Sequence, residues 1–216
     1  MAFDLDTTDR LLSTTRAVRK RLDLNRDVPR EVVLDCIRLS QQAPTGSNTQ
    51  GWRWLVVIDP DKRAALAELY RKGGEDYLAA GRAQAEASGR AQTARVLDSA
   101  LYLAENLERV PVHVIPCLKG RVGEGLPPAM LAGFYGSIYP AVWSFQLALR
   151  SRGLGTVLTT LHLLFEQEAA ALLGIPDDVT QCGLLPVAYT VGDDFKPADR
   201  PAPERITYWN GWKATP

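Results

Sequence analysis

The segment from Ala43 to Trp54 constrains the fold most, because it joins a helical pattern to a strand pattern through small polar residues. Pro29 is typical of the first turn of a helix, and Pro44 disfavours helical geometry at the residue before it, so the helix must end before Pro44. Residues 54–58 form a continuous apolar run of strand length, which predicts a buried inner strand. The residues between the two elements indicate a binding loop. The helix is predicted to bury Val33, Cys36, Ile37 and Ser40.

Further elements follow along the chain. The apolar stretch over residues 128–149 is predicted as a buried central helix, bent or broken at Pro140. A polar, glycine-punctuated segment over residues 81–90 indicates a mobile excursion between two helices. These two helices are predicted over residues 62–80 and 91–107, and a second buried strand over residues 110–118.

Glycines mark the ends of the remaining elements. Gly153 ends the apolar helix and is followed by a strand to about Thr159, and Gly174 ends a helix over residues 166–173. A last strand covers residues 184–191, and Asp6 or Thr7 caps a first short helix. The order mixes α and β elements without regular βαβ alternation or the glycine fingerprint of a dinucleotide-binding fold.

Composition limits the class of protein. Hydrophobic residues make up 46% of the 216 residues, enough for a core, and the sequence shows no linker-like tract, which predicts one domain over residues 1–216. Twenty-five basic residues balance 25 acidic ones, which argues against nucleic acid as the main partner.

Cysteine usage and apolar patterning point to a reduced cytoplasm. Cys36, Cys117 and Cys182 are widely spaced, so they support neither a disulfide framework nor a metal site, and they are expected to be inert core residues. The first residues lack the pattern of a secretory signal, and polar residues interrupt the stretch over 128–149 too often for a membrane span.

A basic run over residues 16–21 contains four cations in six residues. Because the chain as a whole is neutral, this local positive charge indicates a discrete anion rather than a polymer. Taken alone, the run is most simply a solvated basic helix end.

Four pieces of the sequence together resemble the FMN-dependent nitroreductase family. The resemblance implies an α+β fold, a three-layer α/β/α sandwich with a central mixed sheet, in an intertwined homodimer with two FMN sites at the interface. Members usually carry R-R-S-x-R and A-P-S-x-x-N-x-Q-P-W, and this chain departs from them at Thr15, Ala17, Thr45 and Gly51. The pieces are residues 16–19, the loop over 43–54, residues 153–156 and the tail over 200–203.

The resemblance also assigns residues to the cofactor. The phosphate of FMN is expected on Arg16, Arg19 and Arg200, because guanidinium groups donate paired hydrogen bonds to phosphate. Ala17 lacks the hydroxyl of the usual serine, so Lys20 is a candidate substitute. The loop of the other subunit is expected to contact the ribityl chain and ring through Pro44, Thr45, Gly46, Asn48 and Gln50. The reactive edge of the flavin is expected to face Thr159, Thr160 and Leu161.

The implied activity is electron transfer from NADH or NADPH through flavin N5 to nitroaromatic, quinone or similar electron-poor acceptors by a ping-pong mechanism, with no catalytic side chain assigned. Two alternatives remain open: reductive dehalogenation or ene/dehydrogenase-type chemistry on the same fold, and a non-catalytic flavin-binding or interaction dimer.

Several segments are left with open roles. His113 is expected to be structural, whereas His162 either touches substrate or caps a turn. The aromatic tail over residues 207–212 is expected to pack against the partner subunit. Residues 73–90 or 119–128 are the candidate substrate lid.

Overall fold

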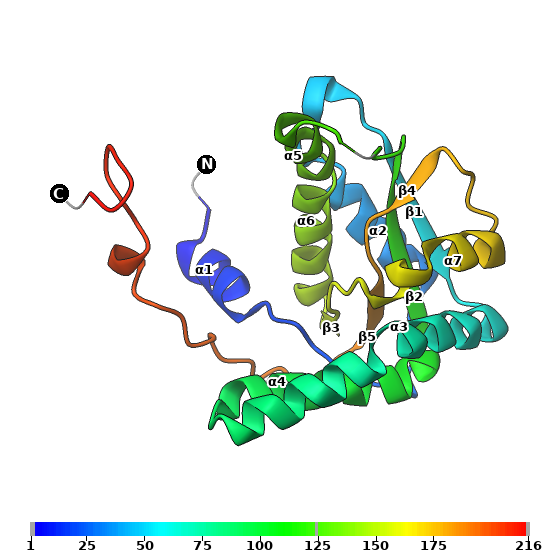
Figure 1. The fold of residues 1–216 in the computed structure, drawn as a ribbon, viewed down its shortest axis with the longest axis horizontal. Coiled ribbons are helices and arrows are strands. Elements are labelled where there is room, and N and C mark those ends of the chain that lie inside the picture. Colours follow the sequence, from blue (N-terminus) through cyan, green and yellow to red (C-terminus); the bar gives the residue numbers. More distant parts are fainter. Residues whose placement is uncertain (1–2, 124, 215–216) are drawn as a thin grey trace.

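The computed structural model describes residues 3–123 and 125–214, and its centre is an antiparallel sheet (Figure 1). The strand order is β1, β2, β5 and β3, and β4 pairs with β2 beside β5. Every ladder between these strands is antiparallel, and the parallel contribution comes from isolated bridges. The strands are β1 (Trp52–Val57), β2 (Val112–Lys119), β3 (Leu154–Gly155), β4 (Val179–Gln181) and β5 (Leu185–Tyr189).

Helices cover both faces of the sheet, which gives the three-layer sandwich. α2 and α6 pack together on one face, and α3 packs with α4, α7 and the 3₁₀ segment η3 on the other. The helices are α1 (Leu5–Thr14), α2 (Arg30–Ser40), α3 (Pro60–Ala87), α4 (Ala91–Asn106), α5 (Pro128–Gly136), α6 (Tyr139–Arg150) and α7 (Glu166–Leu173). The 3₁₀ segments are η1 (Gly46–Asn48), η2 (Leu107–Arg109), η3 (Leu161–Phe165) and η4 (Pro203–Arg205).

β2 lies at the centre and is buried on both faces. Val112 and Val114 belong to the apolar cluster with α2 and α6, whereas Ile115 and Cys117 belong to the cluster with α3, α4 and α7. Because successive side chains of a strand point to opposite faces, one strand supplies both cores. The prediction of a buried strand over residues 110–118 is confirmed.

The local signals around α2 were read correctly. α2 begins directly after Pro29 and buries Val33, Cys36, Ile37 and Ser40, which is the predicted set. The hydroxyl of Ser40 donates to the carbonyl of Ile37 at 2.7 Å, so its burial leaves no unpaired donor. α7 ends at Gly174 in the left-handed conformation, as predicted.

The predicted excursion over residues 81–90 is wrong, because α3 continues to Ala87. Gly81 is a packing position: a Cβ there would lie 3.3 Å from the side chain of Leu97 on α4. The turn comes later, at Gly89, which has a positive φ of 69°.

Other expectations fail because the decisive contacts are tertiary. The strand predicted over residues 54–58 is at the edge of the sheet in this chain rather than inside it. The apolar stretch splits into α5, which is exposed, and α6, in which Pro140 occupies the first turn. The first helix is capped by Asp4, whose carboxylate accepts from the Thr7 amide. The strand after Gly153 has only two residues, and β4 was not predicted.

The three cysteines are buried core residues, as the sequence predicts. Cys36, Cys117 and Cys182 are unpaired and buried, and desolvation raises their pKa values to about 11, 12 and 12, so they stay protonated at neutral pH. Within the described residues, every helix is too short or too polar to cross a membrane.

Two buried histidines make stability sensitive to mild acid. Burial lowers the pKa values of His113 and His162 to about 4 from 6.5, so the unfolded chain binds more protons between these values. We expect the free energy of unfolding to fall by up to about 3 kcal/mol per histidine as the pH drops from 6.5 to 4. Urea unfolding at several pH values measures this, and the H113Q/H162Q variant should show a flatter profile over the same range. An unchanged profile in the variant would assign the acid sensitivity to other groups.

Candidate functional site

The basic segment is attached to the sheet next to β3. Ala17 forms a parallel bridge with Thr156, and the amide of Val18 donates to the Thr156 carbonyl at 2.9 Å. A second bridge joins Leu22 to Thr190. The chain between the two bridges turns, since the Leu22 amide donates to the Arg19 carbonyl at 3.2 Å. The turn leaves the side chains of Arg16 and Lys20 exposed and those of Arg19 and Arg21 partly buried.

The attachment needs a glycine at position 155. A Cβ there would lie 3.0 Å from the Cβ of Val18 and 2.7 Å from Cγ2 of Thr190. The segment can therefore approach β3 only because residue 155 has no side chain.

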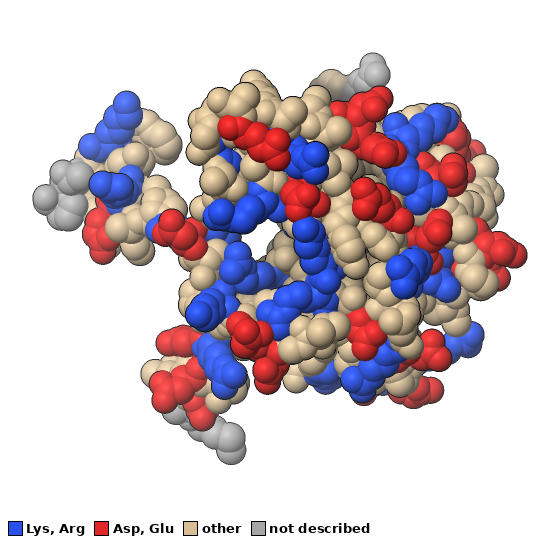
Figure 2. Space-filling view, turned by 90° about the horizontal axis from the view of Figure 1, so that it is seen from below, with Lys and Arg blue, Asp and Glu red and all other residues tan. Residues whose placement is uncertain are grey.

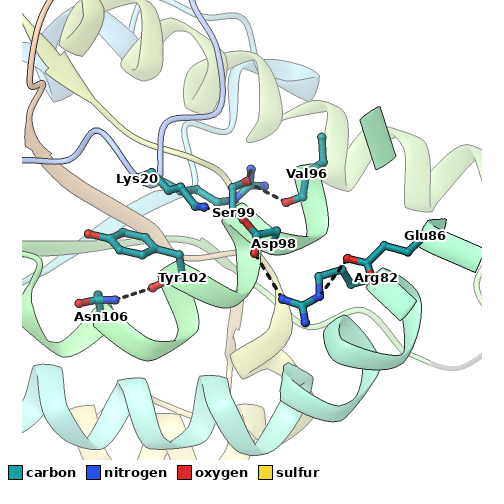
Figure 3. A network of polar contacts seen from close by, with 9 residues as sticks. Lys20, Arg82, Glu86, Val96, Asp98, Ser99, Tyr102 and Asn106 are labelled. Carbon is teal, nitrogen blue, oxygen red and sulfur yellow. Dashed lines mark hydrogen bonds and ion pairs between the residues drawn. The ribbon is translucent and has the colours of Figure 1, made fainter. Parts of the chain in front are cut away.

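The cations of the run have different partners. Arg16 donates to the Lys196 carbonyl at 3.1 Å, and Arg19 donates to Oγ of Ser99 at 3.4 Å. Lys20 pairs with Asp98 on α4, and Asp98 also contacts Arg82 on α3 (Figure 3). Partial burial lowers the pKa of Arg19 below its ordinary value, a desolvation that an anionic ligand would offset.

Arg21 holds the start of the C-terminal tail. Its guanidinium donates to the Val191 carbonyl at 2.8 Å, pairs with Asp194 at 2.6 Å and lies 4.2 Å from the ring centroid of Phe195. Gly192 leaves room for this side chain, because a Cβ there would lie 2.4 Å from Arg21 Nη2. Arg21 therefore positions the segment that leads to Arg200.

These contacts build a cavity of about 1070 Å³ on the side of the molecule formed by α4. Figure 2 shows a hollow there with Lys and Arg side chains on its rim. Of the residues that the resemblance assigns to the phosphate end, Arg16, Ala17, Arg19 and Arg200 line this cavity, whereas Lys20 does not. The sequence does not predict that α4 lines this cavity, because the only signal that its lining residues give is helical spacing. The α4 residues are Gln92, Arg95, Val96 and Ser99.

The predicted binding loop over residues 43–54 lies outside the cation cavity of the same chain. The Gly46 amide donates to Oγ of Ser137 at 3.0 Å, which docks the loop at the end of α5. Ser47, Asn48 and Gln50 have positive φ values of 51°, 53° and 47°, a conformation that costs energy for non-glycine residues. Pro44, Thr45, Gly46, Asn48 and Gln50 do not line the cation cavity of the same chain.

The third predicted segment is rigidly held. Thr159 pairs with Leu184 through both backbone groups, at 3.0 and 2.8 Å, and its hydroxyl donates to the Tyr70 hydroxyl at 3.0 Å. Gly73 and Gly74 let α3 approach Leu161, since a Cβ at either would overlap it. Thr160 remains exposed beside these fixed neighbours.

Neither histidine is placed for acid–base chemistry. His113 is fully buried, with Nε2 2.8 Å from the Leu107 carbonyl, as expected for a structural residue. His162 is also fully buried, so it does not reach substrate in this conformation. Within the described residues, no group of three or more His, Cys, Asp and Glu side chains could hold a metal ion.

Solved structures share this fold. The chain superposes on oxidized iodotyrosine deiodinase bound to FMN and 3-iodo-L-tyrosine with a TM-score of 0.69, at 22% identity, covering 94% of this chain and 99% of the other. It superposes on a BluB-like flavoprotein from Clostridium difficile 630 with a TM-score of 0.67, at 19% identity, covering 96% and 99%. For the FMN and NADPH-dependent nitroreductase NfnB from Sphigopyxis sp. strain HMH, the TM-score is 0.66 at 18% identity, covering 94% and 99%.

Curated relatives add a sequence match. Iodotyrosine deiodinase 1 of Rattus norvegicus is 29% identical over 182 residues, and the human protein is equally similar over the same length. The alignments cover 83% of this chain but only 60% of each relative.

The fold and cavity define an α+β protein whose basic site suits a phosphorylated cofactor. The model of the nitroreductase family matches residues 12–189, and the chain belongs to that family.

The glycine at position 155 gives a test of how the site is assembled. We expect Gly155→Ala to lower the free energy of unfolding by about 1–3 kcal/mol, because the added methyl overlaps Val18 and Thr190. Gly133→Ala in α5 is the matched control, because nothing lies within 4 Å of its added Cβ. Chemical unfolding of both variants measures the difference, and equal stabilities would show that the segment tolerates displacement.

Proposed function

We propose that the protein is an FMN-dependent oxidoreductase that takes electrons from NADH or NADPH and passes them to electron-poor acceptors such as nitroaromatics or quinones. The observation that carries this proposal is the meeting of Arg16, Arg19 and Arg200, from opposite ends of the chain, in one cavity. Membership of the nitroreductase family and the fold shared with FMN-bound structures support it.

The residues that line the cavity fit the phosphate of FMN. Guanidinium groups donate paired, charge-assisted hydrogen bonds to phosphate, and Arg16 and Arg19 are held in place by the sheet and by α4. The cofactor, when bound, would accept and release the electrons. Arg16, Arg19 and Arg200 would anchor its phosphate. In the segment over Thr159, Thr160 and Leu161, Thr159 would hold the position, and Thr160 and Leu161 would present backbone groups and the Thr160 hydroxyl to the ring.

A homodimer completes the proposed site. The strained loop with Asn48 and Gln50 does not line the cavity of its own chain, so we assign it to the ring in the partner's site. The C-terminal tail extends away from the body and exposes large apolar side chains that a second copy would cover (Figure 1). These exposed side chains are Ile206, Tyr208, Trp209 and Trp212.

Reductive dehalogenation is the second candidate. It is favoured by the similarity to iodotyrosine deiodinase 1, which exceeds one quarter identity over most of this chain. The two reactions are compared by giving the reduced, FMN-loaded protein 3-iodo-L-tyrosine in one assay and a nitroaromatic in another. Iodide release without nitro reduction would replace the first proposal by the second.

Single substitutions test the phosphate site. We expect Arg16→Gln and Arg19→Gln each to weaken FMN binding by about tenfold or more, because each removes a charge-assisted contact. Lys20→Gln should change it by less than about threefold, since Lys20 pairs with Asp98 outside the cavity and surface pairs contribute little. Flavin fluorescence titration of the apoprotein measures both, with riboflavin as the ligand without phosphate. Equal losses for FMN and riboflavin would contradict the assignment.

Removal of the tail tests the dimer. We expect a chain ending at residue 201, which keeps Arg200, to be monomeric and to bind FMN at least about tenfold more weakly, because the partner's loop no longer reaches the site. Light scattering coupled to size exclusion gives the mass. The full-length W209F/W212F variant keeps aromatic packing and should remain dimeric. A truncated chain that stays dimeric would place the interface elsewhere.

A further inference from the structure

One face of α4 lines the cavity, and only Ser99 on this face, which accepts a hydrogen bond from Arg19, has a role in the phosphate site proposed above. Gln92, Arg95, Val96 and Ser99 follow the spacing that puts side chains on one side of a helix. The buried residues of the same helix, Ala100, Leu103 and Ala104, lie on the side that packs into the core with α3. The fold therefore presents a mostly polar stripe of α4 to the cavity.

The cavity holds more positive charge than a flavin phosphate requires. Arg16, Arg19, Arg95 and Arg200 line it against the single acid Asp199. A phosphate monoester carries a charge of about −1.5 to −2 at neutral pH. Arg16, Arg19 and Arg200 can match this charge. One guanidinium group is left over.

Arg95 has no partner that would explain its position. Among residues 3–123 and 125–214, its exposed side chain makes no hydrogen bond or ion pair. Asp98, three residues further along α4, is already held by Lys20 and Arg82, as Figure 3 shows for Arg82. The acid closest in sequence on this helix is thus neutralised by other cations, and Arg95 remains available to an anion from solution.

We propose that Arg95 and Gln92 bind the diphosphate of the reduced nicotinamide dinucleotide next to the FMN phosphate. This inference rests on the proposed function, because the diphosphate is the anionic group that NADH and NADPH share. A guanidinium fork suits its oxygens, and the Gln92 amide can donate a further hydrogen bond. Gln92 also lies in the first turn of a helix of 16 residues without an acid in that turn, where the helix dipole favours an anion.

The test uses the FMN-loaded protein and two electron donors. Arg95→Gln should raise the concentration of NADH or NADPH needed for half-maximal flavin bleaching by about tenfold, because one charge-assisted contact is lost. The same variant should bleach normally with N-benzyl-1,4-dihydronicotinamide, which carries the reactive ring without phosphate. Arg109→Gln, an exposed cation of η2 outside the cavity, is the matched control and should behave as wild type with both donors.

A binding measurement that needs no turnover accompanies the kinetics. Calorimetric titration of the FMN-loaded protein with inorganic pyrophosphate should show binding that Arg95→Gln weakens by about tenfold and Arg109→Gln does not. Equal pyrophosphate binding in wild type and Arg95→Gln would overturn the proposal.

Two results separate this inference from the proposed function. If Arg95→Gln weakens FMN binding but not riboflavin binding, Arg95 belongs to the flavin phosphate site and the inference is wrong while the proposed function stands. If neither NADH nor NADPH bleaches the wild-type flavin, the proposed donor is wrong, and the inference falls with it even where pyrophosphate binds.

Discussion

The attachment of the basic segment to the sheet beside β3 is the constraint on which the site depends. Two bridges, Ala17 with Thr156 and Leu22 with Thr190, fix both ends of a short turn. The backbone between them cannot shift without breaking one of these bridges, and the close approach of the segment to β3 requires a glycine at position 155. The cations of the turn are therefore held by backbone geometry, so little of their positional order has to come from the ligand.

This attachment also decides which cations remain available. Within the run, Lys20 forms an ion pair with α4 and Arg21 forms one with the tail. Arg16 and Arg19 line the cavity instead. The Arg21 pair positions the tail that forms one wall of the cavity, whereas the exposed pair of Lys20 with Asp98 contributes little. Lys20 links the segment to α4, and Arg21 links it to the chain that brings Arg200 back.

The sequence predicted what is local and missed what depends on tertiary contacts. α2 was predicted with its buried residues, because Pro29, Pro44 and the apolar spacing between them act within a few residues. Gly81 was misread as a loop signal, since its reason is the approach of Leu97 from another helix. Arg16, Arg19 and Arg200 were grouped by family resemblance, and the structure places them in one cavity. Arg95 has no such pattern, and only the packing of α4 brings it there.

The conformation of the loop over residues 46–50 supports the proposal that a second copy of the chain completes the site. Left-handed φ values at Ser47, Asn48 and Gln50 cost on the order of 1–3 kcal/mol each in sparsely populated conformations. Within the chain, the Gln50 side-chain amide donates to the Asn48 amide oxygen at 3.0 Å, and the Gly46 amide donates to Oγ of Ser137. Three further hydrogen bonds close the loop on Thr45 and Gly46. Net gains of about 0.5–1.5 kcal/mol per hydrogen bond are of the same order as this cost, so the loop can hold its shape without a ligand. Asn48 and Gln50 stay exposed in this shape, which suits the contact with the partner's site that the proposed dimer assigns to them.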